Sequence, residues 1–205
     1  MLSRSWMSGV LVLWAGAVVG GSAIQWRYAN APGPREATPE HWPQTQGVTR
    51  EPTGFTLVMF AHPKCPCTRA SLEVLGALLE RTGGSFSARV LLWVPDTADA
   101  GWHEGELWRR AREMPGVQVH ADVRGEEARR FGALTSGHTV VYDPEGRLVF
   151  SGGLTATRGH PEEGAGARTL LALARSRSPE RSRTEVYGCG LREPSARTAR
   201  TQGEP

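Results

Sequence analysis

The sequence predicts an α/β fold in which helices flank a mixed sheet, preceded by an apolar N-terminal helix. Three observations support this prediction. Short β-favouring runs alternate with helix-like segments from residue 55 onward, which is the order typical of a sheet covered by helices. The last two of these runs follow each other directly through a tight turn, which adds an antiparallel hairpin. The chain also begins with a long stretch that carries almost no charge.

The N-terminal segment, residues 1–27, has the composition of a signal anchor or a signal peptide. No side chain in Met7–Ile24 is charged. Trp6 precedes this run and Trp26 follows it, as aromatic residues do at the two interfaces of a membrane span. Small residues at 21–23 also suit cleavage by a signal peptidase. Because positive charge comes before the apolar core, we expect the globular part to lie outside the cytoplasm.

Two flanking segments leave a single domain over residues 50–190. Residues 28–49 are rich in Pro, Gly and Thr without an apolar period, which predicts a flexible tether. Residues 191–205 are almost entirely polar, which predicts a disordered tail. The formal net charge is only +3 and the arginines form no nucleic-acid-binding motif, so we expect no nucleic-acid partner.

The first half of the domain alternates strands and helices. FTLVMF at 55–60 predicts a short strand, and leucines at helical spacing predict an amphipathic helix over 68–81. ARVLLWV at 88–94 is apolar without alternation, as in a strand that is buried on both faces. Three further elements follow: a helix at 105–113, a strand at 116–123 and a short helix at 126–133.

The second half predicts a hairpin and a final helix. TVVYDPEGRLVFSGG, residues 139–153, contains two strands joined by an Asp-Pro-Glu-Gly turn. Pro at the second position and Gly at the fourth suit a type I turn. Residues 162–176 predict the last helix, with Pro161 at its first position.

Two cysteines lie one residue apart where the first strand gives way to a helix. The expected helix start makes Cys65 the N-cap residue and Pro66 the first helical residue, followed by Cys67. A sulfur at the N-cap feels the positive end of the helix dipole, and Lys64 and Arg69 add positive charge nearby. These features lower the pKa of a thiol below its free value of about 8.5, so they favour a nucleophilic thiolate at Cys65.

The order of elements, with a cysteine pair between the first strand and the next helix, resembles the thioredoxin superfamily over about residues 50–175. The stretches HPKCPCTRAS, TSGHTVVYDPEGRLVFSGGLTATRGH and VYGCGL further resemble bacterial thioredoxin-like proteins of the RedB type. The resemblance implies a thioredoxin-like fold and a thiol–disulfide oxidoreductase with a redox-active disulfide and a thiol or disulfide client. Because an oxidising compartment lets disulfides persist, we expect a periplasmic domain anchored at the bacterial inner membrane. A reducing role would also require an electron donor, for which a membrane partner is the candidate.

The chain departs from the thioredoxin pattern, which places two residues between the cysteines. Here one residue separates them, and Thr68 stands where the second cysteine would be. A disulfide between Cys65 and Cys67 would close a small, strained ring that is easily reduced. Either this pair is a strongly oxidising couple, or Cys65 has a different partner. Cys189, in the apolar-flanked VYGCGL, offers another partner if its segment docks on the domain. We therefore expect Cys65 as the nucleophile, Cys67 as the first resolving thiol and Cys189 as a third member, with a free packed thiol or a structural bridge as the alternative for Cys189.

A second departure concerns the loop that faces the cysteines in thioredoxins, where a cis-proline precedes a strand. Aligned on FGALTSGHTVVY, this chain has Gly137 or His138 at that place and no proline. His138 is a candidate proton donor or ligand, and Arg158 and His160 follow the last strand at the same edge. His160 also precedes Pro161, so capping of the last helix is its alternative role.

The main alternative to thiol exchange is the binding of a soft metal by a copper-handling protein on the same fold. Cys65 and Cys67, with His62 three residues before Cys65 and Met59 nearby, are ligands suited to Cu(I). Zinc fits less well, because a closed structural site takes four well-spaced ligands. A binding module with an inert cysteine pair is a third hypothesis, against which the thiolate-favouring setting argues.

Overall fold

The structure is a computed structural model that describes residues 4–99, 101–176 and 182–191. The chain divides into two compact units, residues 1–31 and 32–205. The first unit is a single helix, α1 (Arg4–Asn30). Its apolar stretch is long enough to cross a membrane, with a mean hydropathy of 1.8, and a signal sequence would meet the same test. Most of the tail expected over 191–205 lies outside the described residues.

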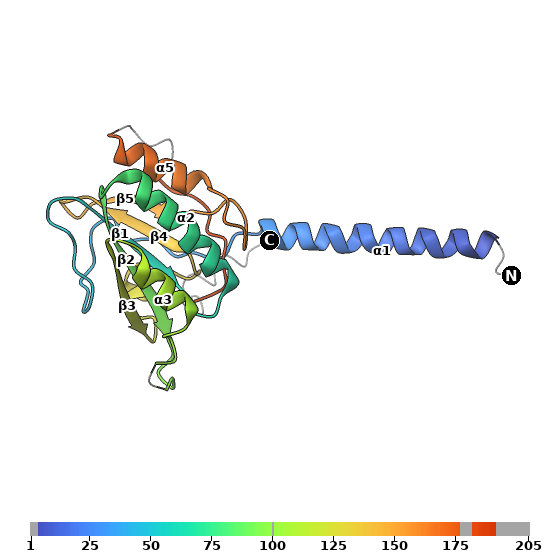
Figure 1. The fold of residues 1–205 in the computed structure, drawn as a ribbon, viewed down its shortest axis with the longest axis horizontal. Coiled ribbons are helices and arrows are strands. Elements are labelled where there is room, and N and C mark those ends of the chain that lie inside the picture. The colour runs from blue at the N-terminus through green and yellow to red at the C-terminus, as the bar shows by residue number, and fades with distance from the viewer. Residues whose placement is uncertain (1–3, 100, 177–181, 192–205) are drawn as a thin grey trace. The chain divides into compact units, whose positions relative to one another are not determined.

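The second unit is an α/β domain whose elements follow the predicted order (Figure 1). The strands form one five-stranded sheet in the order β3-β2-β1-β4-β5. The first three strands are mutually parallel, whereas β4 runs antiparallel to both β1 and β5. The expected mixed sheet with a terminal hairpin is therefore confirmed. The elements are β1 (Phe55–Ala61), α2 (Pro66–Thr82), β2 (Phe86–Val94), α3 (Glu106–Glu113), β3 (Val117–Val123), α4 (Glu126–Arg130), β4 (His138–Tyr142), β5 (Leu148–Gly152) and α5 (Ala165–Ala174).

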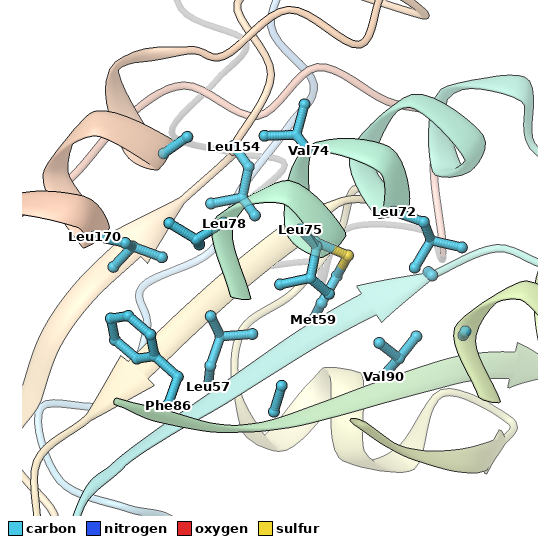
Figure 2. Close-up of a cluster of buried hydrophobic side chains, with 14 of the residues drawn as sticks. Leu57, Met59, Leu72, Val74, Leu75, Leu78, Phe86, Val90, Leu154 and Leu170 are labelled. Carbon is cyan, nitrogen blue, oxygen red and sulfur yellow. The ribbon is translucent and has the colours of Figure 1, made fainter. Parts of the chain in front are cut away.

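The main core lies between one face of the sheet and the helices α2, α3 and α5 (Figure 1). Leu57 and Met59 point from β1 into this core, which also contains Leu72 and Leu75 of α2 (Figure 2). All four side chains are at most 1 % exposed. Burying a leucine side chain contributes roughly 1.5–3 kcal/mol. The helical spacing of leucines in the sequence therefore marks the face that fixes α2 on the sheet.

The opposite face of the sheet carries a smaller core that includes chain from before β1. Val48 is 2 % exposed within this core. Trp42 packs edge-on against both Phe131 and Tyr142, with ring centroids 5.2 Å apart in each pair. Such aromatic pairs add about 0.5–1.5 kcal/mol each to the area that they bury. These apolar side chains fix the N-terminal part of the second unit on the sheet.

The structure thereby corrects the flexible tether expected over 28–49. The Tyr142 hydroxyl donates to the Pro39 carbonyl oxygen at 2.9 Å, and the Thr38 side chain is buried. Residues 32–49 therefore lie along the domain, although they contain no helix and no regular strand. The composition of this segment is polar and rich in proline, so the sequence did not indicate that a few apolar and hydroxyl side chains would make these contacts.

The last helix begins later than the sequence predicts. α5 starts at Ala165 with Gly164 as its N-cap, so Pro161 is not its first residue. The chain just before the helix is already paired, because the Ala156 N–H donates to the Glu162 carbonyl oxygen at 3.0 Å. This pairing holds the residues around Pro161 in a turn and delays the helix.

Candidate functional site

Cys65 lies where β1 passes into α2. After Ala61 the chain turns, and the Cys65 N–H donates to the His62 carbonyl oxygen at 3.2 Å. Cys65 is the N-cap residue, with an extended backbone (φ −98°, ψ 125°), and Pro66 is the first helical residue. This confirms the predicted start of the helix. The Cys65 side chain makes no capping hydrogen bond, and its sulfur is bonded instead to that of Cys189.

The partner cysteine belongs to residues 182–191, which we call the C-terminal strap. The first part of the strap lies alongside the end of β5, where the Gly153 N–H donates to the Glu185 carbonyl oxygen at 3.1 Å. On its other side, the Gly33 N–H donates to the Val186 carbonyl oxygen at 2.8 Å. The strap is therefore held between the sheet and the segment that precedes β1.

The second part of the strap lies against the loop before β4. The Ser136 N–H donates to the Cys189 carbonyl oxygen at 2.8 Å, and the Leu191 N–H donates to the Leu134 carbonyl oxygen at 2.7 Å. A Cβ atom at Gly188 would overlap the Ser136 carbonyl oxygen, so only glycine fits at this approach. These contacts bring Cys189 to the start of α2.

Cys67 provides a third sulfur beside the disulfide. It lies in the first turn of α2, is 6 % exposed and is free. The sulfur atoms of Cys65, Cys67 and Cys189 all lie within 4.8 Å of one another. The structure thus brings together the three predicted site cysteines, but it pairs Cys65 with Cys189 and not with Cys67. Residues two apart at a helix start do not face each other, which disfavours the shorter bridge.

Two buried hydroxyl groups fix the turn that carries Cys65. Thr68 Oγ1 and Ser136 Oγ are 2.7 Å apart, and the Thr68 hydroxyl donates to the His62 carbonyl oxygen at 2.9 Å. Ser136 Oγ in turn accepts the His62 N–H at 3.0 Å. Thr68, at the place of a second thioredoxin cysteine, is therefore a buried polar link. Sequence reasoning missed Ser136, whose only signal is its place in the TSGH stretch.

His62 does not join the sulfur cluster, which corrects the expected metal set of His62, Cys65 and Cys67. Its Nδ1 accepts the Lys64 N–H at 3.2 Å, and its ring stacks on Trp93 with centroids 5.4 Å apart. Burial, and then the charge of Lys64, lower the pKa of His62. Among the described residues, the group whose ligand atoms converge contains Cys189 in place of His62.

The charges near Cys65 differ from those expected. The Arg69 guanidinium makes two hydrogen bonds to the Glu106 carboxylate, at 2.5 and 2.8 Å, so its charge is balanced. The Lys64 ammonium lies 4.2 Å from the centre of the Trp102 ring. Lys64, Arg69 and Glu106 line an open pocket of about 280 Å³, which Cys65 also lines. The positive charge available to the cysteine is therefore that of Lys64 and of the helix end.

His138, expected as a proton donor or ligand, belongs to a different network. It is 2 % exposed, and its Nε2 lies 2.9 Å from Ser151 Oγ, which is 2.7 Å from Thr38 Oγ1. Burial, and then the charge of Arg35, lower the pKa of His138 to about 4. Its imidazole is therefore neutral at neutral pH, and it is not grouped with the three sulfurs in the described structure.

Of the two candidates that follow the last strand, only one contacts the site. The Arg158 guanidinium donates to the Gly188 carbonyl oxygen, next to Cys189. His160 is exposed, and its capping role is wrong because Gly164 is the N-cap of α5. Arg158 thus helps to hold the strap.

The fold and the site together define a thioredoxin-like domain. Its mixed sheet is flanked by helices, and a cysteine that forms a disulfide stands at the start of the helix that follows β1. No protein-family model matches the chain, and no curated protein does.

The chain is similar in fold to solved structures of other proteins. A hypothetical protein from Sinorhizobium meliloti 1021 aligns with a TM-score of 0.61 and 17 % identity over 79 % of this chain and 98 % of that one. An uncharacterized conserved protein from Geobacillus kaustophilus aligns with a TM-score of 0.59 and 19 % identity, over 82 % of this chain and 93 % of that one. These likenesses show the fold alone.

A more distant match is the exposed lipoprotein thioredoxin Etrx1 from Streptococcus pneumoniae strain TIGR4. Its TM-score is 0.44, with 16 % identity over 60 % of this chain and 86 % of that one, and at this level it carries no argument about function. The narrower resemblance to RedB-type proteins has no support from these matches and stays a prediction.

Proposed function

We propose that the protein is a membrane-tethered, extracytoplasmic thiol–disulfide oxidoreductase. The observation that carries the proposal is the cysteine cluster, in which a free Cys67 thiol stands beside the Cys65–Cys189 disulfide with all three sulfurs within 4.8 Å. Disulfides exchange when a thiolate attacks one of their sulfurs. A third thiol at this distance suits a bond that opens and reforms.

Cys65 and Cys189 form the redox couple. When a client dithiol is oxidised, its two sulfurs join, the Cys65–Cys189 bond breaks, and the two cysteines take up the electron pair and become thiols. The reverse reaction reduces a client disulfide and closes the bond again. The N-terminal end of α2 stabilises the Cys65 thiolate in both directions.

Cys67 has a different role from the first resolving thiol expected from the sequence. Its attack on the Cys65 sulfur would form a Cys65–Cys67 bond and release the Cys189 thiolate. That step moves the disulfide without changing the oxidation state of the protein. Because the shorter bridge is disfavoured, Cys67 serves as a neighbouring thiol that takes the bond from Cys189 only transiently.

The strap contacts the domain through more than the disulfide. Val186 is 1 % exposed and Leu191 5 % exposed, and backbone hydrogen bonds hold the strap on both sides of Cys189. Because these contacts also hold the strap on the domain, the Cys65–Cys189 disulfide is less necessary as a purely structural bridge. This supports a redox role.

The α1 helix supplies the proposed membrane attachment, at the bacterial inner membrane with the domain in the periplasm. That compartment is oxidising and lets disulfides persist. The proposed clients are proteins or small molecules that carry thiols or disulfides. A membrane electron donor would reopen the disulfide if the protein works as a reductant.

The test is the reduction of insulin, or of a small disulfide, by dithiothreitol, with the full chain in detergent micelles as the catalyst. Cys65→Ser removes one half of the redox couple, so we expect its activity to fall to the uncatalysed rate. Far-UV circular dichroism of the variant checks that it is folded. Equal activity of Cys65→Ser and the wild type would sink the proposal.

A second candidate function is the binding of a soft metal such as Cu(I), favoured by the same convergence of three sulfurs. In the reduced protein, Cys65, Cys67 and Cys189 offer the thiolate ligands that Cu(I) prefers. The test is a titration of the reduced full chain with Cu(I) against a competing chelator. Binding of one copper per chain that is lost in Cys189→Ser would support this function. Equal Cu(I) binding by Cys189→Ser and the wild type would exclude the three-sulfur site.

A further inference from the structure

The two sulfurs of the disulfide have different surroundings. Cys65 is 2 % exposed at the start of α2, whereas Cys189 is only half-buried, between Gly188 and Gly190 of the strap. Gly190 is exposed, and a Cβ atom added there would meet nothing within 4 Å. Cys189 is therefore the more exposed of the two disulfide-bonded residues.

The two sulfurs also differ in how well their surroundings stabilise the negative charge of a leaving thiolate. An external thiolate attacks one sulfur and expels the other as a thiolate, and the better-stabilised thiolate leaves faster. Cys65 caps the 17-residue helix α2, whose N-terminal end favours negative charge, and the Lys64 ammonium adjoins it in sequence. Cys189 lies in a non-helical segment. An external thiolate is therefore favoured to attack the Cys189 sulfur and to expel Cys65 as the thiolate.

From these surroundings we infer that Cys189 is the client-facing sulfur of the protein and Cys65 the internal one. The inference rests on the proposed oxidoreductase function and deepens it. It differs from the expectation that Cys65 itself meets the client. The pocket of about 280 Å³ beside Cys65 is then not the route by which a client thiol reaches the disulfide.

In the oxidising direction, a client thiolate attacks the Cys189 sulfur and forms a mixed disulfide, and the Cys65–Cys189 bond breaks with Cys65 leaving as a thiolate. A second client thiolate then attacks the client sulfur of the mixed disulfide. A client disulfide forms, Cys189 leaves as a thiolate, and the two protein cysteines hold the electron pair. The protons lost by the client thiols go to solvent or to the two new thiolates.

In the reducing direction the same steps run backward. The Cys189 thiolate attacks a client disulfide and expels one client thiolate. The Cys65 thiolate then attacks the Cys189 sulfur, closes the bond and expels the second client thiolate.

The strap is built to keep Cys189 beside Cys65 while a client is attached. The Ser136 N–H holds the Cys189 carbonyl oxygen at 2.8 Å, and the Leu191 N–H is bonded to Leu134 just beyond it. The Arg158 guanidinium binds the carbonyl oxygen of the residue before. These bonds involve no sulfur, so we expect them to persist when the disulfide opens and to keep the Cys65 thiolate within reach of the mixed disulfide.

The test locates the first mixed disulfide. Oxidised full-length Cys67→Ser protein in detergent is exposed briefly to reduced glutathione, quenched with acid, alkylated and mapped by peptide mass spectrometry. Removal of Cys67 leaves Cys65–Cys189 as the one exchangeable bond and prevents its migration. Cys67→Ala and the wild type are treated in parallel, so that a folding failure of one variant does not decide the result.

We expect glutathione on Cys189 and the alkyl group on Cys65, on the order of tenfold in excess over the opposite arrangement. Glutathione on Cys65 in equal or greater amount would overturn the inference and leave the proposed function standing. A bond that glutathione opens in none of the three proteins would overturn the proposed function as well.

Discussion

Cys65 and Cys189 are 124 positions apart in the sequence, yet their Cα atoms lie 6.4 Å apart and a disulfide joins them. That separation lies within the range usual for disulfides. The bond connects the start of α2 to the C-terminal strap, and Cys67 lies close to both sulfurs. The site is therefore a three-cysteine arrangement. The CPC motif supplies Cys65, which is one half of the disulfide, and Cys67, which is the neighbouring free thiol.

The Cys67→Ser variant separates the roles of the neighbouring thiol and the redox couple. Because Cys65 pairs with Cys189, we expect this variant to retain a reversible loss of two hydrogens that maps to Cys65–Cys189. Intact-mass measurement and peptide mapping across redox buffers check this. Accumulation of client mixed disulfides in Cys67→Ser would instead restore Cys67 as the resolving thiol.

Two glycines that flank Cys189 form a matched pair for testing how the strap docks. A methyl group at Gly188 would overlap the Ser136 carbonyl oxygen, whereas one at Gly190 would meet open space. Overpacking costs about 1–3 kcal/mol, so we expect Gly188→Ala to lower the equilibrium constant for forming the disulfide by about tenfold or more. Gly190→Ala is the control. Equal constants for the two variants, measured in glutathione buffers, would show that the strap does not approach the loop so closely.

The buried hydroxyl of Thr68 stabilises the turn before α2. Thr68→Val removes the donor to the His62 carbonyl oxygen and the partner of the Ser136 hydroxyl. Leaving such groups unpaired costs about 1–3 kcal/mol, so we expect the free energy of unfolding to fall by about 2 kcal/mol. Urea unfolding of the oxidised protein measures the change. Thr68→Ser keeps the hydroxyl and is the control, and a Thr68→Val protein as stable as this control would refute the role.

His138 makes the stability of the domain depend on pH. Burial lowers its pKa from 6.5 to about 4 in the folded protein. Between these values the unfolded chain binds a proton that the folded chain does not, so stability is full above pH 6.5 and falls as the pH drops toward 4. The loss is on the order of 3 kcal/mol. We expect His138→Gln to remove this part of the pH dependence in urea unfolding and the exposed His160→Gln to retain it; equal slopes in both variants would contradict the assignment.

The fold could be predicted from the sequence because its signals are local. The leucine spacing in α2, the apolar run of β2 and the Asp-Pro-Glu-Gly turn each report on neighbouring residues, and each element is present. The late start of α5 escaped prediction, because Glu162 is drawn into a pairing with Ala156 that only the folded chain creates.

The site could be predicted only in part. Cys65 at a helix start follows from local pattern, and the apolar flanks of Cys189 indicated a docked segment. The pairing itself depends on contacts across the chain, such as those of Ser136 with the strap, which leave no local trace. For the same reason, a few apolar side chains such as Trp42 outweigh the tether-like composition around them.

The most direct test of the account is a redox titration of the full-length wild-type chain in detergent. The protein is equilibrated in glutathione buffers, quenched with acid, alkylated and mapped by mass spectrometry. We expect a Cys65–Cys189 disulfide that opens and closes reversibly within the range of these buffers, with Cys67 alkylated throughout the oxidised range. A disulfide that stays closed at every ratio, as structural disulfides with potentials below about −300 mV do, would contradict a role in thiol exchange.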